Sequence, residues 1–165
     1  MQHERQSIME ELSPPFQVTS PACQTTPFVF CSPHSGSVYP RAFVASSRLD
    51  PLSLRKSEDV LVDQLFSGVT SLGAPLIAAR FPRAYLDVNR EPYELDPELH
   101  GPLPKYANTQ TTRVAGGLGT IARIVADSEE IYHAERRPSL EAAIARIELL
   151  YKPYHAALQD LVENT

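Results

Sequence analysis

The sequence predicts an α/β domain with a ligand site at the end of a central strand. An apolar run over residues 28–31 is typical of a buried strand, and a second such run covers 74–79. Between them, apolar residues at helical spacing over 57–71 predict a helix with one buried face. Strand, helix and strand in this order are typical of a sheet covered by helices. Ligands of such sheets bind beyond the carboxyl ends of the strands, where this chain places His34.

Composition narrows the classes of function. The chain has 165 residues, of which 42% are hydrophobic, enough for one domain with its own core. Its net charge of −5 gives no reason to expect a nucleic-acid partner, and no apolar run approaches the length of a membrane span. The polar N-terminus does not resemble a signal peptide. With only Cys23 and Cys31, we expect no disulfide framework and a cytoplasmic protein.

The other predicted elements complete one domain over residues 14–165, preceded by a polar segment over 1–13 with a fraying helix. Residues 14–27 are expected to be an extended lead-in. In the 57–71 helix, Ser57 is the expected N-cap, with Glu58 and Asp59 in the first turn. Further along, the patterns predict strands over 83–89 and 120–125, and a helix over 138–163 that begins near Pro138 and kinks at Pro153.

His34 is the first candidate for chemistry. Zinc and similar metals take imidazole and carboxylate ligands, and Glu58, Asp59 and Asp63 are the nearest carboxylates in sequence. The alternative is that His34 caps a loop and that these carboxylates cap a helix and face solvent. Cys31 close to His34 also raises a thiol-hydrolase interpretation, although three residues across a proline turn is poor spacing for such a pair.

Arg83, Asn89 and Arg90 are the second group of candidates. A guanidinium group can bind a substrate carboxylate through two hydrogen bonds, or hold the oxyanion that develops on a reacting carbonyl. The alternative interpretation is structural: Arg83 and Arg90 would pair with Asp87 and Glu91.

Several ordered motifs resemble the N-formylglutamate amidohydrolase family over roughly residues 14–160. They are Ser32-Pro-His-Ser-Gly36 with Tyr39-Pro40, Ser57-Glu-Asp59 with Val62-Asp63, Gly73-Ala-Pro75, and Phe81-Pro-Arg-Ala-Tyr-Leu-Asp-Val-Asn-Arg-Glu-Pro92. The resemblance implies a phosphorylase/hydrolase-like fold of the zinc-carboxypeptidase type, with a mixed sheet flanked by helices. It also implies hydrolysis of the N-formyl amide of N-formyl-L-glutamate, or of a related N-acyl amino acid, to formate and glutamate in histidine breakdown.

The resemblance assigns roles to individual residues. It implies attack on the formyl carbon by a water activated at Zn²⁺ or another divalent metal, with an arginine holding the oxyanion. The implied residues are His34 and Glu58 as metal ligands, Arg83 as the catalytic arginine, and Asn89, Arg90 and Ser35 as substrate-binding residues.

Members of this family continue past the last helix into a further strand with another metal histidine. We therefore expect a fold that is incomplete on its C-terminal side, weak or absent activity of the chain alone, and a complementing C-terminal chain or homo-oligomer as partner. The alternative is a non-catalytic acyl-amino-acid binding or interaction module that has lost the complete metal site. A cysteine amidase using Cys31 ranks third.

Overall fold

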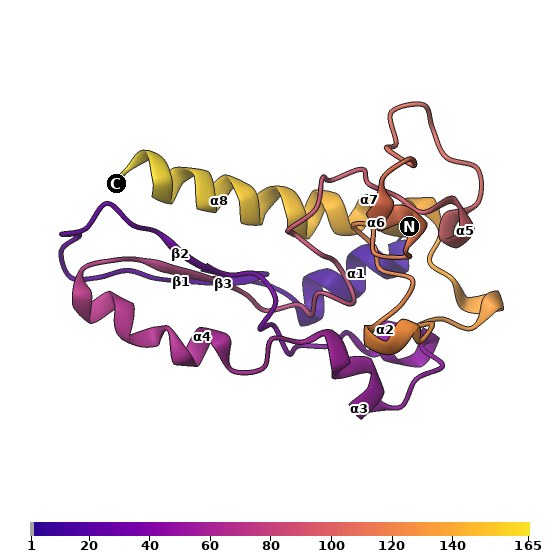
Figure 1. The fold of residues 1–165 in the computed structure, drawn as a ribbon, viewed down its shortest axis with the longest axis horizontal. Coiled ribbons are helices and arrows are strands. Elements are labelled where there is room, and N and C mark those ends of the chain that lie inside the picture. The colour runs from indigo at the N-terminus through magenta and orange to yellow at the C-terminus, as the bar shows by residue number, and fades with distance from the viewer. Residues whose placement is uncertain (1) are drawn as a thin grey trace.

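A computed structural model describes residues 2–165 as an α/β fold around a small mixed sheet (Figure 1). The sheet contains β1 (Phe16–Thr19), β2 (Phe30–Ser32) and β3 (Leu76–Ala79) in the order β1-β3-β2. β1 runs antiparallel to β3, whereas β2 runs parallel to it. This arrangement confirms the predicted α/β class.

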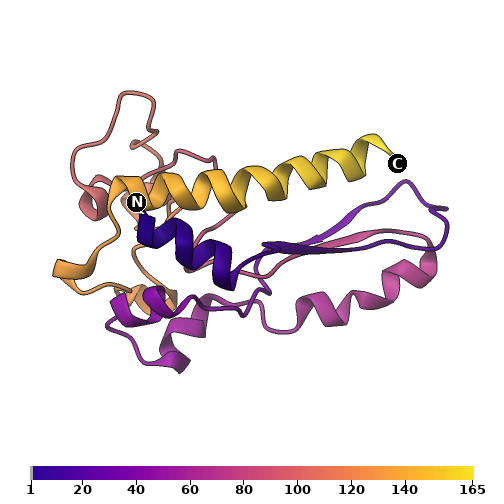
Figure 2. The same cartoon turned by 180° about the vertical axis from the view of Figure 1, so that it is seen from behind.

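The described helices surround this sheet and a larger loop-rich region. α8 and the segment that contains α4 lie on opposite sides of the sheet in both views (Figures 1 and 2). The α-helices are α1 (Gln2–Glu11), α2 (Arg41–Ser46), α3 (Pro51–Leu54), α4 (Val62–Leu65), α5 (Pro97–His100), α6 (Thr112–Ala115), α7 (Leu140–Arg146) and α8 (Lys152–Glu163). Segments of 3₁₀ helix span Arg55–Ser57, Ser67–Leu72, Ala126–Ser128 and Ala134–Arg136. No helix within residues 2–165 combines the length and apolar character needed to cross a membrane.

The strand predictions were correct in part. β3 confirms the strand predicted over 74–79. β2 overlaps the strand predicted over 28–31, but it begins two residues later and ends one residue later. The prediction that this first strand is buried was wrong, because β2 is at the edge of the sheet and Cys31 is exposed. The stretch expected to be a lead-in contains β1, which pairs with β3 at long range.

The strands predicted over 83–89 and 120–125 are wrong. Residues 83–89 form turns, and 84–88 are buried without alternation. The polar side chains at alternate positions do not mark a separate polar face: Tyr85 and Asp87 are buried, where Tyr85 donates to Glu4 and Asp87 binds His34. Residues 120–125 form only an isolated bridge, from Ile124 to Glu130.

The helix predicted over 57–71 is broken into shorter pieces. Leu61 has a φ of 62°, which ends any continuous helix and leaves α4 with a single turn. Ser57 ends a 3₁₀ turn instead of capping a helix, and Glu58 and Asp59 lie in the connection that follows it. The face expected to be buried is largely exposed: Leu65, for example, keeps 78% of its surface accessible.

The long C-terminal helix is confirmed, and its hydrogen-bond pattern is irregular next to Pro153, where a kink was predicted. Ser139 caps α7 by accepting a hydrogen bond from the Ala142 amide, so Pro138 precedes the cap and is not the first helical residue. A π-helical segment, Ile147–Tyr151, joins α7 to α8 just before Pro153. Because proline cannot donate to the carbonyl four residues earlier, the widened turn accommodates it without ending the helix.

Arg146 of α7 links α1 to the rest of the fold through an ion pair with Glu4. Its buried guanidinium donates to Glu4 Oε1 at 2.5 Å and lies 3.9 Å from the centre of the Tyr85 ring. Ile8 and Leu12 of the same N-terminal segment are buried in the core. Packing and an ion pair at long range therefore hold the helix that was expected to fray.

Candidate active site

His34 lies just beyond β2 with both ring nitrogens beside carboxylates. Its Nε2 is 2.8 Å from Asp87 Oδ1, and its Nδ1 is 3.4 Å from Asp59 Oδ2. Since an ionised carboxylate only accepts hydrogen bonds, the short contact assigns the Nε2 proton to a bond with Asp87. The Asp59 amide donates to the His34 carbonyl at 3.0 Å, which holds this turn against the histidine loop.

Gly36 fixes the position of the histidine loop. A Cβ atom built on Gly36 would lie 2.2 Å from the Phe81 carbonyl oxygen, which is far inside van der Waals contact. The neighbouring Val38 amide donates to the Arg80 carbonyl at 2.9 Å. The glycine therefore allows the loop to touch the segment that leads from β3 into the Asp87 turn.

Asp87 is the anionic centre of the site. Its buried carboxylate accepts hydrogen bonds from His34, from Arg83 Nη2 at 2.9 Å and from the Asn89 amide at 2.9 Å, and Arg90 Nη2 is 3.4 Å away. Burial raises the pKa of Asp87, but the hydrogen bond from His34 and the charge of Arg83 outweigh burial and hold the pKa well below its usual range. Asp87 is thus a fixed negative charge that orients both the imidazole and the guanidinium.

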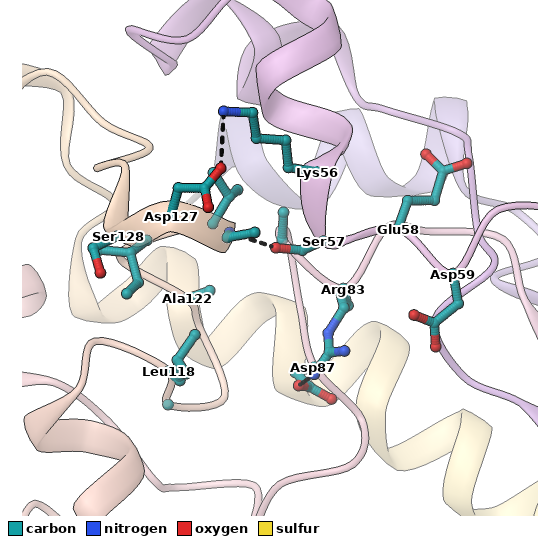
Figure 3. Close-up of a pocket in the computed structure, with 15 residues that line it drawn as sticks. Lys56, Ser57, Glu58, Asp59, Arg83, Asp87, Leu118, Ala122, Asp127 and Ser128 are labelled. Carbon is teal, nitrogen blue, oxygen red and sulfur yellow. Dashed lines mark hydrogen bonds and ion pairs between the residues drawn. The ribbon is translucent and has the colours of Figure 1, made fainter.

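A cavity of about 450 Å³ opens beside this centre (Figure 3). In Figure 3 the Arg83 side chain points towards Asp87, and Leu118 and Ala122 form part of the opposite wall. The charged residues that line the cavity are Glu58, Asp59, Asp87, Asp127, Lys56 and Arg83. The lining thus carries more carboxylates than cations, and Lys56 is already paired with Asp127 and Glu129.

The Glu58 carboxylate binds Tyr39 and Arg55, and not His34. Its carboxylate accepts hydrogen bonds from Tyr39 Oη at 3.0 Å and from Arg55 Nε and Nη2 at 2.9 and 2.8 Å. Burial, together with the neighbouring Glu58 carboxylate, raises the pKa of the Tyr39 hydroxyl. In Figure 3 the Glu58 and Asp59 carboxylates point in different directions. The metal role of Glu58 stays a prediction, and Asp59 is the carboxylate that meets the second nitrogen of His34.

Of the predicted substrate-binding residues, Asn89 and Arg90 lie close to Asp87, and the polar groups of Arg90 and Ser35 are used inside the fold. Arg90 donates through Nε to the Leu118 carbonyl and through Nη1 to the Asn89 carbonyl, and only 9% of its side chain is exposed. Asn89 is exposed. Ser35 is buried, and its hydroxyl lies 2.7 Å from that of Ser32. Their roles towards a substrate stay predictions.

The sequence pattern placed Asp87 on the polar face of the strand predicted over 83–89 and as an ion-pair partner of the arginines, but Asp87 was not among the predicted site residues. Its hydrogen bond to His34 spans 53 positions of sequence, beyond the reach of any local pattern. The one available signal was an acidic residue inside the motif that carries Arg83, Asn89 and Arg90.

A strand-end histidine held by a buried carboxylate, with an arginine at the wall of a cavity, defines a candidate hydrolytic site in an α/β protein. Residues 26–165 match the family model of N-formylglutamate amidohydrolase. The chain therefore belongs to the N-formylglutamate amidohydrolase family. A comparison with curated proteins gave no match.

One similar solved structure is the N-formylglutamate amidohydrolase from Ralstonia eutropha JMP134. It shares 38% sequence identity with this chain and superposes with a TM-score of 0.80 over 91% of it. The same match covers 52% of the Ralstonia chain, so the present chain spans about half the length of that relative.

Proposed function

We propose that this site takes part in hydrolysing the N-formyl amide of N-formyl-L-glutamate, or of a related N-acyl amino acid, to formate and glutamate. The observation that carries the proposal is the position of His34 between Asp87 and Asp59, with Arg83 of the cavity wall bound to the same Asp87 carboxylate. The name of the Ralstonia relative and the family match support the choice of substrate.

The proposal includes a divalent metal, with Zn²⁺ as the first choice and His34 Nδ1 and Asp59 as its ligands. Two ligands of one tetrahedral zinc, each at ~2.0–2.1 Å, lie about 3.3 Å apart. The observed Nδ1–Oδ2 separation of 3.4 Å fits this spacing and is long for a direct hydrogen bond. Asp87 on the other ring nitrogen is the usual partner of a metal-bound histidine. When bound, the metal would act as a Lewis acid and lower the pKa of a water.

The carboxylate excess of the cavity also supports a cation. Without one, the anionic substrate would approach a wall that carries more negative than positive groups. Within residues 2–165, however, no group of three His, Cys, Asp or Glu side chains is placed to hold a metal. The proposed site thus requires a ligand beyond those that the described residues offer, as the zinc-carboxypeptidase-like interpretation of the fold expects.

In the proposed reaction, the oxygen of water adds to the formyl carbon, and the C–N bond breaks as the amine nitrogen takes a proton. Negative charge develops on the former carbonyl oxygen, and Arg83 is the cavity-lining donor suited to stabilise it. Asp87 holds the Arg83 guanidinium in place at 2.9 Å. Asn89 and Arg90 are the proposed clamp for the substrate carboxylate, which requires Arg90 to exchange its present carbonyl acceptors for the substrate.

A second candidate is a metal-free module that binds acyl amino acids, which the incomplete ligand set favours. A cysteine amidase is disfavoured, because both ring nitrogens of His34 already contact carboxylates. In addition, desolvation raises the pKa of the Cys31 thiol, which opposes formation of the thiolate nucleophile.

The test is to incubate the chain with N-formyl-L-glutamate and quantify both bound substrate and released formate. We expect formate release to be slow, dependent on Zn²⁺, and lost with a chelator or in His34→Ala. Formate release that persists under chelation would contradict the metal-dependent proposal. Substrate binding without metal and without formate would support the binding module instead.

A further inference from the structure

Arg146 carries a charge inside the protein that the proposed reaction does not use. Its guanidinium is buried, and its Nε donates to Glu4 Oε1 of α1. The Tyr85 hydroxyl donates to the same carboxylate oxygen at 2.6 Å. Burial raises the pKa of this hydroxyl, which therefore stays a donor. Glu4 is thus the shared acceptor of a buried cation and a buried phenol.

The contacts of Arg146 lead from α1 to the turn that carries Asp87. Its Nη1 donates to the Tyr85 backbone carbonyl at 3.1 Å, and its guanidinium carbon lies 3.9 Å from the centre of the Tyr85 ring. Asp87 follows two residues later, and its amide donates to the Thr120 carbonyl at 2.8 Å. Arg146 and Thr120 therefore hold the two ends of the short backbone segment that places the Asp87 carboxylate.

This support depends on Glu4. A buried guanidinium that loses its partner is costly, and it reduces that cost by moving towards water or another acceptor. Such a movement would release Tyr85 from its contacts with Arg146. Because functional groups must be held within about 0.5 Å of their working geometry, a small shift of the Tyr85 segment would weaken the hydrogen bond between Asp87 and His34.

The family match assigns no role to Glu4, because the match begins at residue 26 and α1 lies outside it. We propose that Glu4 is a positioning residue of the candidate active site, acting through Arg146 and Tyr85 on Asp87 and thereby on His34. The inference deepens the proposed function, since it concerns the support of the same site. α1 is then part of the structure that orients the imidazole, although none of its described residues lines the cavity.

Three variants of the whole chain test this role. Glu4→Ala removes the shared acceptor, Glu4→Gln keeps an acceptor oxygen, and Glu10→Ala removes an exposed carboxylate of the same helix. The first readout is the proton resonance of His34 Nε2 in the metal-free protein, which reports on the hydrogen bond to Asp87. We expect this resonance to move upfield in Glu4→Ala, because the bond weakens, and to keep its parental position in the other two variants.

Zn²⁺ affinity, measured by calorimetric titration, is the second readout. The outer partners of a metal-bound histidine typically contribute about 10–100-fold to metal affinity. Because Glu4 acts on such a partner from one step further away, we expect about tenfold weaker binding in Glu4→Ala, the lower end of that range. Glu4→Gln should recover most of the loss, and Glu10→Ala should bind as the parent does.

Gly73→Ala controls for lost stability alone. Gly73 has a φ of 84° in the turn before β3, and an added Cβ would overlap the Thr25 side chain, so this variant should be destabilised. All variants are compared under conditions in which urea titration shows them to be folded. Gly73→Ala should leave the resonance and the affinity unchanged. Changes equal to those in Glu4→Ala would leave Glu4 only a stabilising role and overturn the inference, as would a parental resonance in Glu4→Ala.

The resonance requires neither a bound metal nor a substrate. A parent chain that binds no Zn²⁺ would therefore contradict the proposed metal site, whereas the resonance would still decide the role of Glu4.

Discussion

Asp87 Oδ1 accepts a 2.8 Å hydrogen bond from His34 Nε2, across 53 positions of sequence and in a buried setting. The same carboxylate holds Arg83 and the Asn89 amide. One acidic side chain therefore connects the strand-end loop, the arginine at the cavity and the turn that follows.

Replacing Asp87 with Asn should destabilise the fold at neutral pH. The change leaves Arg83 and Arg90 without their shared anion, and we expect a loss of about 3 kcal/mol, the lower end for removing one partner of a buried pair. Urea unfolding at pH 7 would measure it. Asp63→Asn, in the short helix α4 and outside this cluster, is the matched control and should change stability little. Equal stability of Asp87→Asn and the parent would contradict the central role of Asp87.

The stability difference between the parent and Asp87→Asn should depend on pH. Because the folded-state pKa of Asp87 lies below the ordinary 3.8, its ionised form stabilises the fold fully above that value. The contribution is lost as the pH falls from about 4 towards the lower folded-state pKa. The difference between the unfolding free energies of the two proteins should therefore be constant from pH 7 to about pH 5 and should shrink between about pH 4 and pH 2.5. Parallel curves over this range would show that Asp87 does not titrate as inferred.

Metal affinity should distinguish Asp59 from Glu58. If His34 Nδ1 and Asp59 share the cation, Asp59→Asn should weaken Zn²⁺ binding by at least about tenfold, and Asp87→Asn by about 10–100-fold through the orientation of the histidine. Glu58→Gln should change affinity little, because Glu58 is held by Arg55 and Tyr39. Calorimetric titration of each variant with Zn²⁺ would decide. The reverse pattern, in which Glu58→Gln weakens Zn²⁺ binding and Asp59→Asn leaves the affinity unchanged, would support Glu58 as the ligand instead.

Glycine should be required at position 36. In Gly36→Ala the new methyl group would meet the backbone of Arg80 and Phe81, and we expect a loss of about 2 kcal/mol or more from overpacking. Gly68→Ala is the matched control, because no atom lies within 4 Å of its added Cβ. Thermal unfolding of the two variants would compare them. Similar melting temperatures would show that the histidine loop can move away from residues 80–81.

Arg146 should be a major source of stability in the link between α1 and α7. Removing it in Arg146→Met leaves Glu4 and the Tyr132 hydroxyl without their partner, and we expect a loss of about 3–5 kcal/mol. The exposed pair of Lys152 and Glu148 is the control, for which Lys152→Met should cost less than about 1 kcal/mol. Chemical denaturation would measure both. Comparable losses would mean that the buried ion pair contributes no more than a surface pair.

The sequence by itself determined the elements whose signals are local. The apolar run that became β3, the long helix with its proline irregularity and the strand-end place of His34 all depend on neighbours within a few residues. It also determined membership of the family through ordered motifs.

Only the tertiary structure decided which polar groups meet. The period of two over residues 83–89 could not distinguish a half-buried strand from a turn enclosed on all sides, because that enclosure comes from distant segments such as α1. The apolar spacing over 57–71 could not show that its face would stay exposed. Likewise, the bond between His34 and Asp87 exists because β2, β3 and the loop after β3 pack together, and such contacts depend on the whole fold rather than on any local pattern.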